Sequence, residues 1–430
     1  MKSEALMGSI KNKVKFNALI NKEDKWNYLL MYLLIANSAI PFFYLYIEFK
    51  VITFIILIIV FLFKGRTLDK FLFIYLFFFF VLVIGQYYTH KILPIKDYST
   101  IVLRILIAYF TIKIVLNRFF KIYVDIIYLF AIISFLFYIP SIIIPQFAHF
   151  FIKISPYFNP PFNDLLKNEF SQIILFNFNQ IEIFRNSGPF WEPGTFGGFL
   201  IIGIIINTVM KGNIIEKKNI VMVIALLTTL STTNYIAFFL FILIYFIFIE
   251  KKTNPALVII PLLAIFVALF FEVGFLHNKI FSQINEINMY YKAGKVGNRF
   301  VSAYVDLQEF VKHPIFGQGR GEITKQSYSR FEGYRTNGII TYLADFGLMF
   351  FLFYFSNLYI SFYRFCSLYG YKKYLSMAVL FLLMMIGFSE EYYNFPFFYA
   401  LTMLHLAIPR DFLNYFQVNG ISKVNNNYYE

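Results

Sequence analysis

Residues that could carry out chemistry gather in short polar stretches of an otherwise apolar chain. The first stretch, IEIFRNSGPFWEPGTFGGFL at residues 181–200, contains Arg185, Trp191 and Glu192 beside an unusual number of Pro and Gly residues. A carboxylate can accept a proton from an attacking hydroxyl group, and a guanidinium group can stabilise a departing anion. Pro193 also suits the first turn of a helix, where Glu192 would interact favourably with the helix dipole. Glu192 therefore has both a catalytic and a purely structural explanation.

A second stretch, GNRFVSAYVDLQEFVKHPIFGQGRGE at residues 297–322, is rich in arginine. Its apolar residues recur at helical spacing, which predicts an amphipathic helix that ends before Pro314. The Gly-Gln-Gly-Arg-Gly segment lacks the Lys-Ser/Thr of a Walker A loop, so it could be a plain turn. Four arginines are nevertheless close in sequence, and a planar guanidinium fork suits phosphate oxygens. These four residues are Arg299, Arg320, Arg330 and Arg335.

The third stretch, GFSEEYYNFPF at residues 387–397, places Glu390 and Glu391 between two apolar runs. They could form a solvated turn or supply a second carboxylate to the same site. Asp345 lies within an apolar run and is expected to face the protein interior, because a carboxylate in lipid has no partner. Arg104 could either reach water or face the interior. No pair of the five His residues has metal-ligand spacing, and the one Cys excludes an intramolecular disulfide.

The elements that must position these residues are membrane helices. Of the 430 residues, 59% are hydrophobic and only 14% are charged, against about 25% charged in soluble domains. The mean hydropathy is +0.64. Apolar runs long enough to cross about 30 Å of hydrocarbon recur along the chain. They predict about twelve spans, at 27–43, 47–63, 70–88, 99–117, 120–144, 194–210, 219–231, 234–250, 256–274, 338–362, 373–389 and 395–409. Merging the first two spans, or the seventh and eighth, would change the topology.

The distribution of basic residues predicts the orientation of these spans. In this arrangement 22 of the 38 Lys and Arg residues lie in one set of segments, while the short turns on the other side hold Lys50, Lys91 and Lys96. Positive residues favour the cytoplasmic side, so both termini are expected there. Two large extracytoplasmic loops with short helices are predicted at 145–193 and 275–337. The net charge of +14 is then largely a topology signal, and no nucleic-acid partner is expected.

Several motifs, in this order, resemble O-antigen polymerases and O-antigen ligases. RNSGPFWEPGTFGGFLI is similar to the segment that opens the span after their first large outer loop. GNRFVSAYVDLQEFVKHPIFGQGRGE is similar to their G-x-R segment with its Gly-rich end, NGIITYLADFGLMFFLFYF resembles the span that follows, and LLTTLSTTNYIAFF resembles their seventh and eighth spans. The resemblance covers roughly residues 170–400.

The resemblance implies one membrane-embedded glycosyltransferase domain over residues 1–430, in the bacterial plasma (inner) membrane. Such enzymes take a glycan from undecaprenyl diphosphate at the outer face of the membrane. Polymerases add it to another lipid-linked repeat unit, whereas ligases transfer it to lipid A core. The ligases carry His-Asn where this chain has Thr336-Asn337, and the missing His favours a polymerase.

The resemblance also implies roles for individual residues. Arg185, Arg299 and Glu192 are the expected catalytic residues, with Glu192 as the first candidate for the general base. The expected substrate-binding residues are Arg335, Arg320, Asn337, Trp191, Glu390 and Glu391. No metal and no other cofactor is expected. The expected partners are an undecaprenyl-diphosphate-linked oligosaccharide, the lipid bilayer and a chain-length regulator protein.

Two other classes of protein stay open. A transporter or lipid flippase could also have twelve spans, and an internal duplication of the hydropathy profile would favour it. A polyprenyl-phosphate-dependent glycosyltransferase would need a pair of acidic residues in its first outer turn, and the turn at 40–48 has no such pair.

Overall fold

The structure is a computed structural model of the whole chain. It describes residues 25–158, 170–179, 184–250, 298–321 and 337–408, together with scattered residues between 254 and 289. Helices make up nearly all of the described part. They are α2 (Lys25–Ala39), α3 (Pro41–Tyr44), α4 (Ile47–Phe63), α5 (Lys70–His90), α6 (Ile95–Val115), α7 (Phe119–Ile143), α8 (Pro145–Ile154), α9 (Pro193–Lys211), α10 (Lys217–Thr228), α11 (Thr232–Ile244), α15 (Arg299–Lys312), α17 (Gly338–Leu368), α18 (Lys373–Ser389) and α19 (Pro396–Met403).

Short elements complete this description. They are η1 (Leu116–Arg118), η2 (Ser155–Tyr157), η3 (Tyr245–Ile249), η4 (Tyr392–Asn394), η5 (Leu404–Leu406) and an antiparallel hairpin of β1 (Phe170–Ile173) and β2 (Phe176–Asn179). Local signals explain many boundaries. The side chain of Asn298 accepts hydrogen bonds from the backbone N–H groups of Phe300 and Val301, which caps α15. Gly212 ends α9 in the left-handed conformation that favours glycine.

The predicted all-α, multi-span membrane architecture is confirmed. In the described residues, five helical stretches are long and apolar enough to cross a membrane, and shorter apolar helices follow them. They are Lys70–His90, Ile95–Ile143, Pro193–Lys211, Thr232–Ile249 and Gly338–Leu368. The uncertain neighbours are separate helices, because α2 and α3 are distinct from α4, and α10 is distinct from α11. The span at 256–274 lies largely outside the described residues, and the total of twelve stays a prediction.

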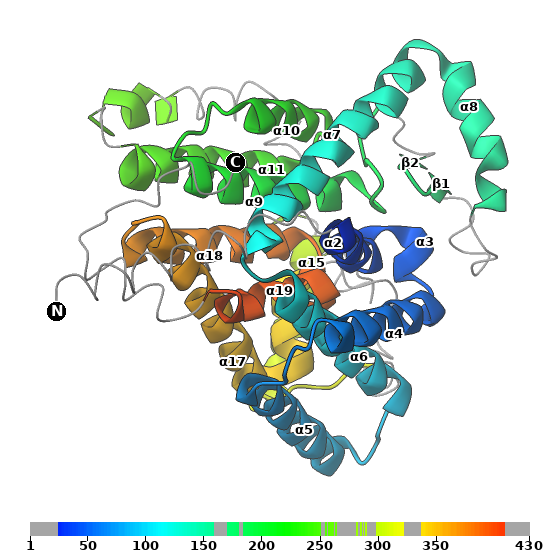
Figure 1. Cartoon of the computed structure of the whole chain (residues 1–430), viewed down its shortest axis with the longest axis vertical. Helices are drawn as coiled ribbons and strands as arrows, with labels where there is room; N and C mark the ends of the chain where they lie inside the picture. The colour runs from blue at the N-terminus through cyan, green and yellow to red at the C-terminus, as the bar shows by residue number, and fades with distance from the viewer. Residues whose placement is uncertain are drawn as a thin grey trace.

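The helices differ sharply in how much of their surface is covered by protein. Within the most apolar stretch of α9, 94% of the residues are buried, against 33% for α5. Helix α9 packs against α7, α10, α11 and α18. In Figure 1, α17–α19 lie between α10 and α11 above and α5 and α6 below. Helix α9 is therefore a central helix, whereas α5 leaves an apolar surface for lipid to cover.

The first large loop has both expected and unexpected structure. Its short helix α8 agrees with the prediction, but the β1–β2 hairpin was not predicted. The alternation of Phe and Asn in Phe176–Asn179 has the period of two that a strand requires. Phe176 and Phe178 pack against Tyr138 and Ala148 in a small cluster separate from the main core. Figure 1 shows α7 leading to α8 and this hairpin at the upper right.

The second large loop contains the predicted amphipathic helix, α15. The apolar residues Tyr304, Leu307 and Val311 of this helix are exposed. Its opposite face packs against α17 and buries Asp306. Asp345 is buried and faces the interior, as predicted. His405 is also buried, and its Nδ1 lies 3.1 Å from Ser361 Oγ.

A break in α17 brings the Gly-rich turn into the helix core. Gly347 has φ of 68° inside α17, which a side chain would disfavour. The break frees backbone groups that pair with the turn, because the N–H groups of Gln318 and Gly319 donate to the carbonyl oxygens of Ala344 and Asp345 at 2.8 and 3.1 Å. The turn is therefore fixed against α17 and is not a free surface loop.

Candidate active site

The N-terminus of α9 allows other parts of the chain to pack very close to its backbone. Pro193 occupies the first helical position and Glu192 the position before it. A Cβ atom on Gly194 would overlap Glu390 Oε1, and one on Gly198 would overlap the Tyr392 hydroxyl. The glycines of the first sequence stretch thus allow the segment after α18 to lie directly on this helix.

The chain leading into α9 is held by the turn between α10 and α11. Asn186 Nδ2 donates to Ser134 Oγ and Thr228 Oγ1, both at 2.9 Å. Arg185 Nε donates to the carbonyl oxygen of Thr229 at 3.0 Å. Thr228 and Thr229 therefore hold the segment that contains Arg185 and Asn186 in place through hydrogen bonds.

Two carboxyl groups meet beside α9. Glu192 Oε1 accepts hydrogen bonds from Trp191 Nε1 at 3.1 Å and Thr195 Oγ1 at 3.5 Å. Glu390 is buried and interacts directly with Glu192. Arg299 Nη2 donates to Glu390 Oε1 at 2.9 Å. Residues more than 190 positions apart in sequence therefore form one carboxyl–carboxyl–guanidinium centre.

The pKa of Glu390 follows from these surroundings. Burial raises its pKa well above the ordinary value of 4.5, and the neighbouring Glu192 raises it further. The positive charges of Arg299 and Arg185 act in the opposite direction and do not cancel this effect. The structure thus brings together four of the predicted residues, namely Arg185, Glu192, Arg299 and Glu390.

The neighbouring residue Glu391 belongs to a second charged cluster, which is formed around Arg320. Arg320 Nε contacts Asp345 Oδ2 at 3.2 Å, and Arg320 Nη2 lies 3.7 Å from Glu391 Oε2. Gln318 Nε2 donates to the other oxygen of Asp345 at 3.2 Å. Arg320 therefore has two carboxylate neighbours, and its place in the structure differs from that of Arg299.

An aromatic group lies beside Glu192, because Trp191 donates to its carboxylate. The rings of Trp191 and Tyr44 have centroids 5.5 Å apart and planes 30° apart. Phe395 lies edge-on to Tyr44 at 5.1 Å. Trp191 was a predicted substrate-binding residue, whereas Tyr44 was not identified from the sequence, because one Tyr in an aromatic-rich segment gives no distinguishing signal.

Asn337 has a structural place at the edge of the site. Its side-chain oxygen accepts from the Ile340 N–H at 2.9 Å and so caps α17. The next residue, Gly338, lies against the Glu390 carbonyl with no room for a Cβ atom. The start of α17, which Asn337 caps, therefore lies directly against the backbone of Glu390. Arg335 lies outside the described residues.

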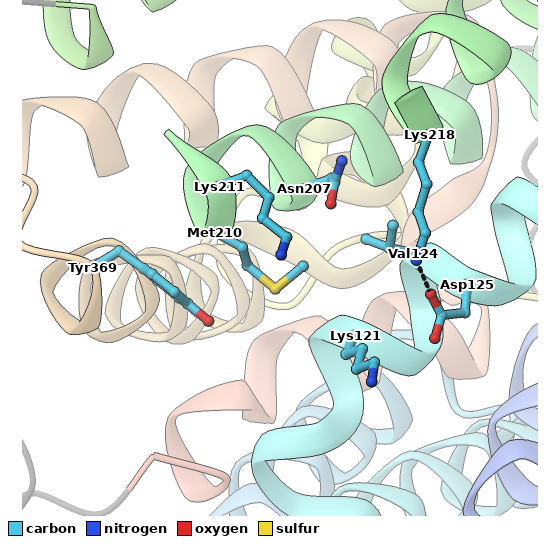
Figure 2. A pocket seen from close by; sticks show the side chains of 8 residues that line it. All are labelled: Lys121, Val124, Asp125, Asn207, Met210, Lys211, Lys218 and Tyr369. Carbon is cyan, nitrogen blue, oxygen red and sulfur yellow. Dashed lines mark hydrogen bonds and ion pairs between the residues drawn. The ribbon is translucent and has the colours of Figure 1, made fainter. Parts of the chain in front are cut away.

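No group of three His, Cys, Asp or Glu side chains in the described ranges has an arrangement that could hold a metal ion. A small open pocket occurs far from the candidate site. Figure 2 shows that Lys121, Asp125, Lys211 and Lys218 line it, and that Lys218 pairs with Asp125. Helix α9 runs from the candidate site to Lys211, a length of about 28 Å at 1.5 Å per residue. This pocket is therefore at the opposite end of α9.

A family model described as O-antigen ligase matches residues 219–355, which run from α10 into α17. The matched part includes Arg299, Arg320 and Asn337, whereas Arg185, Glu192 and Glu390 lie outside it. No curated protein matches the chain.

Proposed function

Because the chain belongs to the O-antigen ligase/polymerase superfamily, we propose that it polymerises undecaprenyl-diphosphate-linked oligosaccharide repeat units. The product would be an O-antigen or a related surface polysaccharide, made at the outer face of the plasma membrane. The observation that carries this proposal is the centre formed by Glu192, Glu390 and Arg299 beside the start of α9.

The reaction follows from the arrangement of charges. A hydroxyl group of the acceptor glycan attacks the anomeric carbon of the donor sugar, and the bond from that carbon to the diphosphate oxygen breaks. Arg299 and Arg185 stabilise the negative charge that develops on the departing undecaprenyl diphosphate. The hydroxyl proton goes to a carboxylate. Atoms and charge then balance without a further reactant.

The carboxyl pair divides this work between its members. Two adjacent carboxylates repel each other, so one of them retains a proton. Burial favours the neutral form of Glu390, as its raised pKa indicates. Glu192 is less buried and its oxygen is aimed by Trp191 and Thr195. Glu192 is therefore the carboxylate that receives the proton, while Glu390 and Arg299 position it.

An O-antigen ligase is the second candidate, because the matching family model carries that description. Ligases would transfer the glycan to lipid A core. The residue before Asn337 is Thr336, where the resembling ligases carry His, and this difference favours the polymerase.

The glycan profile of cells lacking the protein distinguishes the two activities. A polymerase defect removes long chains and leaves lipid A core capped with a single repeat unit. A ligase defect removes the single-repeat cap as well. A normal ladder of chain lengths in the deleted strain would contradict both proposals. A chain-length regulator is a proposed partner of the polymerase and would alter the distribution of chain lengths in that ladder.

A further inference from the structure

We propose that Lys50 and Arg104 form an anion-binding subsite for the glycan substrate, next to the aromatic pair Tyr44–Trp191. This inference rests on the proposed function, since it assumes that the substrate is a glycan. It adds a chemical class to that substrate, because the subsite requires a carboxylate or phosphate group. Neither Lys50 nor Arg104 is part of the Glu192–Glu390–Arg299 centre.

The first observation is a pair of cations, the buried Lys50 and the partly buried Arg104, that form no close ion pair with a carboxylate among the described residues. Lys50 is 3% exposed, its Nζ donates to the Tyr44 carbonyl oxygen, and it lies 5.2 Å from the Tyr44 ring centroid. Arg104 Nη1 donates to the Asn394 carbonyl oxygen at 3.1 Å. Throughout the described ranges, no carboxylate oxygen lies within 4.0 Å of either cation.

The second observation is an unused donor. Arg104 Nε is enclosed and has no hydrogen-bond partner among the described residues. The charges of Lys50 and Arg104 are also close enough to repel each other. Buried charges without a close ion-pair partner are costly in a membrane protein, and such sites commonly serve a function. An anion between these side chains would accept a hydrogen bond from Arg104 Nε and would reduce the repulsion between the two positive charges.

A comparison within the same structure supports this assignment. Arg320 also lies near Arg104, but it contacts the carboxylates of Asp345 and Glu391. Its charge is therefore neutralised within the protein. Lys50 and Arg104 differ from Arg320 because each donates its hydrogen bond to a neutral carbonyl oxygen, and Lys50 also lies over an aromatic ring.

The aromatic pair connects this subsite to the reacting carboxylate. Lys50 contacts both the ring and the backbone carbonyl oxygen of Tyr44. The centroid of the Tyr44 ring lies 5.5 Å from that of Trp191. The Trp191 indole in turn donates to Glu192 at 3.1 Å. A sugar ring presents an apolar face that suits aromatic rings. A sugar lying on Tyr44 and Trp191 would thus place an anionic group at Lys50 and Arg104.

Two sources could supply this anion. One is the carboxylate of an acidic sugar in the repeat unit, and the other is the diphosphate of the second lipid-linked substrate. Both offer oxygen acceptors to the two cations. The experiment below separates them.

Trp191 provides a reporter beside the subsite. The chain has two Trp residues, and the second, Trp26, is 55% exposed. In nanodiscs of zwitterionic lipid whose scaffold protein lacks Trp, the Trp26→Phe protein therefore has Trp191 as its one source of Trp fluorescence. It is titrated with a trigalacturonic acid, with neutral maltotriose and with farnesyl diphosphate. We expect at least one anionic probe to quench Trp191, and the quenching to weaken at high salt.

Substitutions then assign the signal. Lys50→Gln should weaken anion binding by about tenfold or more, as loss of a charged hydrogen bond implies. Lys50→Arg should restore it, while Lys96→Gln, an exposed lysine at a nearby helix start, should have no effect. Repeating the titrations in an Arg299→Gln background removes binding at the other diphosphate site. Lys50-dependent binding of trigalacturonate identifies an acidic sugar, and that of farnesyl diphosphate identifies the second lipid substrate.

Several results would overturn the proposal. They are the absence of any Lys50-dependent quenching by either anion, and binding of maltotriose with the same Lys50 dependence. Thermal melting of each variant shows whether it is folded. Because these titrations need no turnover, their failure leaves the polymerase proposal standing, and failure of the glycan-profile test leaves the binding result standing.

Discussion

Glu192 precedes a helix, yet its side chain does not behave as a helix cap. Its carboxylate accepts no hydrogen bond from the first N–H groups of α9, whereas its backbone carbonyl accepts one from Phe196 at 3.2 Å. The side chain instead contacts Trp191 and Thr195 and lies beside Glu390. A helix-dipole role would contribute about 0.3–1 kcal/mol, too little to explain this arrangement.

The first prediction separates the two explanations for Glu192. Glu192→Gln keeps the shape and can still accept from Trp191, but it is no longer basic. A general base contributes about 100- to 10,000-fold in rate, so long polymer should disappear while the amount of protein in the membrane stays normal. Glu216 is a matched control because it also precedes a helix and caps no N–H group. Glu216→Gln should give a normal glycan ladder, and a normal ladder from Glu192→Gln would leave it a structural residue.

The second prediction concerns the two guanidinium groups. Replacing Arg185 or Arg299 by Ala should abolish polymerisation, measured as glycan length in cells with matched protein amounts. Lys should rescue poorly, because a point charge cannot reproduce two parallel hydrogen bonds to phosphate oxygens. Arg118→Lys, at the start of α7, serves as the control. Full activity of Arg185→Lys would show that positive charge alone is enough.

The third prediction follows from the pKa of Glu390, which is raised above 4.5 by burial and then by Glu192. The folded protein binds this proton more tightly than the unfolded chain, so the stabilisation is fully present below about pH 4.5 and is lost as pH rises through the higher folded value. Glu390→Gln cannot lose a proton. The melting temperature of the wild type should therefore fall relative to that of this variant as the pH rises. A constant difference from pH 4 to 9 would contradict the assignment.

At the scale of elements, the break in α17 positions the Gly-rich turn. The N–H groups of Leu348 and Met349 donate to Pro314 and Ile315 of the turn at 2.8 and 3.2 Å. These bonds replace helical ones and bring Arg320 to Asp345. A helix that continued without a break would have no free backbone groups to offer the turn.

The fourth prediction tests that break. Gly347→Ala puts a Cβ atom against the Ile315 carbonyl and the Gly317 N–H, at a φ of 68°. The backbone conformation, with φ of 68° and ψ of 174°, is nearly exclusive to glycine and costs about 1–3 kcal/mol for Ala, and the overlap adds to this cost. We expect a lower melting temperature and reduced yield of folded protein in detergent. Gly65→Ala is the control, because Gly65 also has positive φ but has no atom within 4 Å of its added Cβ. Equal destabilisation of the two variants would show that overlap with the turn is unimportant.

At the scale of the whole molecule, polar groups separate between the two ends of the helices. The Glu192–Glu390–Arg299 centre lies at the start of α9, and Lys211 with the pocket in Figure 2 lies at its end. The predicted topology assigns the first end to the outside and the second to the cytoplasm.

The fifth prediction tests this topology by labelling single cysteines. Cys366 is buried and is replaced first. Tyr157, in the first large loop, is 89% exposed, and Ile215, between α9 and α10, is 73% exposed. A membrane-impermeant thiol reagent should label Tyr157→Cys in intact cells and Ile215→Cys only after the membrane is opened. Labelling of position 215 in intact cells would show that the predicted orientation is wrong.

Local patterns are sufficient to predict most of the described helices and to select several of the residues that meet beside α9. Apolar runs predicted α9 and α17 because length and hydropathy are local properties. Arg185, Glu192 and Arg299 were selected because charged groups at the edge of apolar spans need a reason to be there. Sequence spacing could not show that Glu390 turns to Glu192 while the next residue, Glu391, turns to Arg320. That choice depends on the extended backbone at Glu390, which points neighbouring side chains in opposite directions.

By itself the sequence determined that this is a membrane protein of many helices, because no soluble core could cover so much apolar surface. It also showed that glycines gather at residues 181–200, but it did not show what they contact. Only the tertiary structure decided that Gly194 and Gly198 make room for Glu390 and Tyr392. It likewise decided which cations are neutralised, since Arg320 meets Asp345 whereas Lys50 and Arg104 meet carbonyl groups. The physical reason is that charge pairing and close packing depend on distances in space between helices, and hydropathy along the chain contains no such distances.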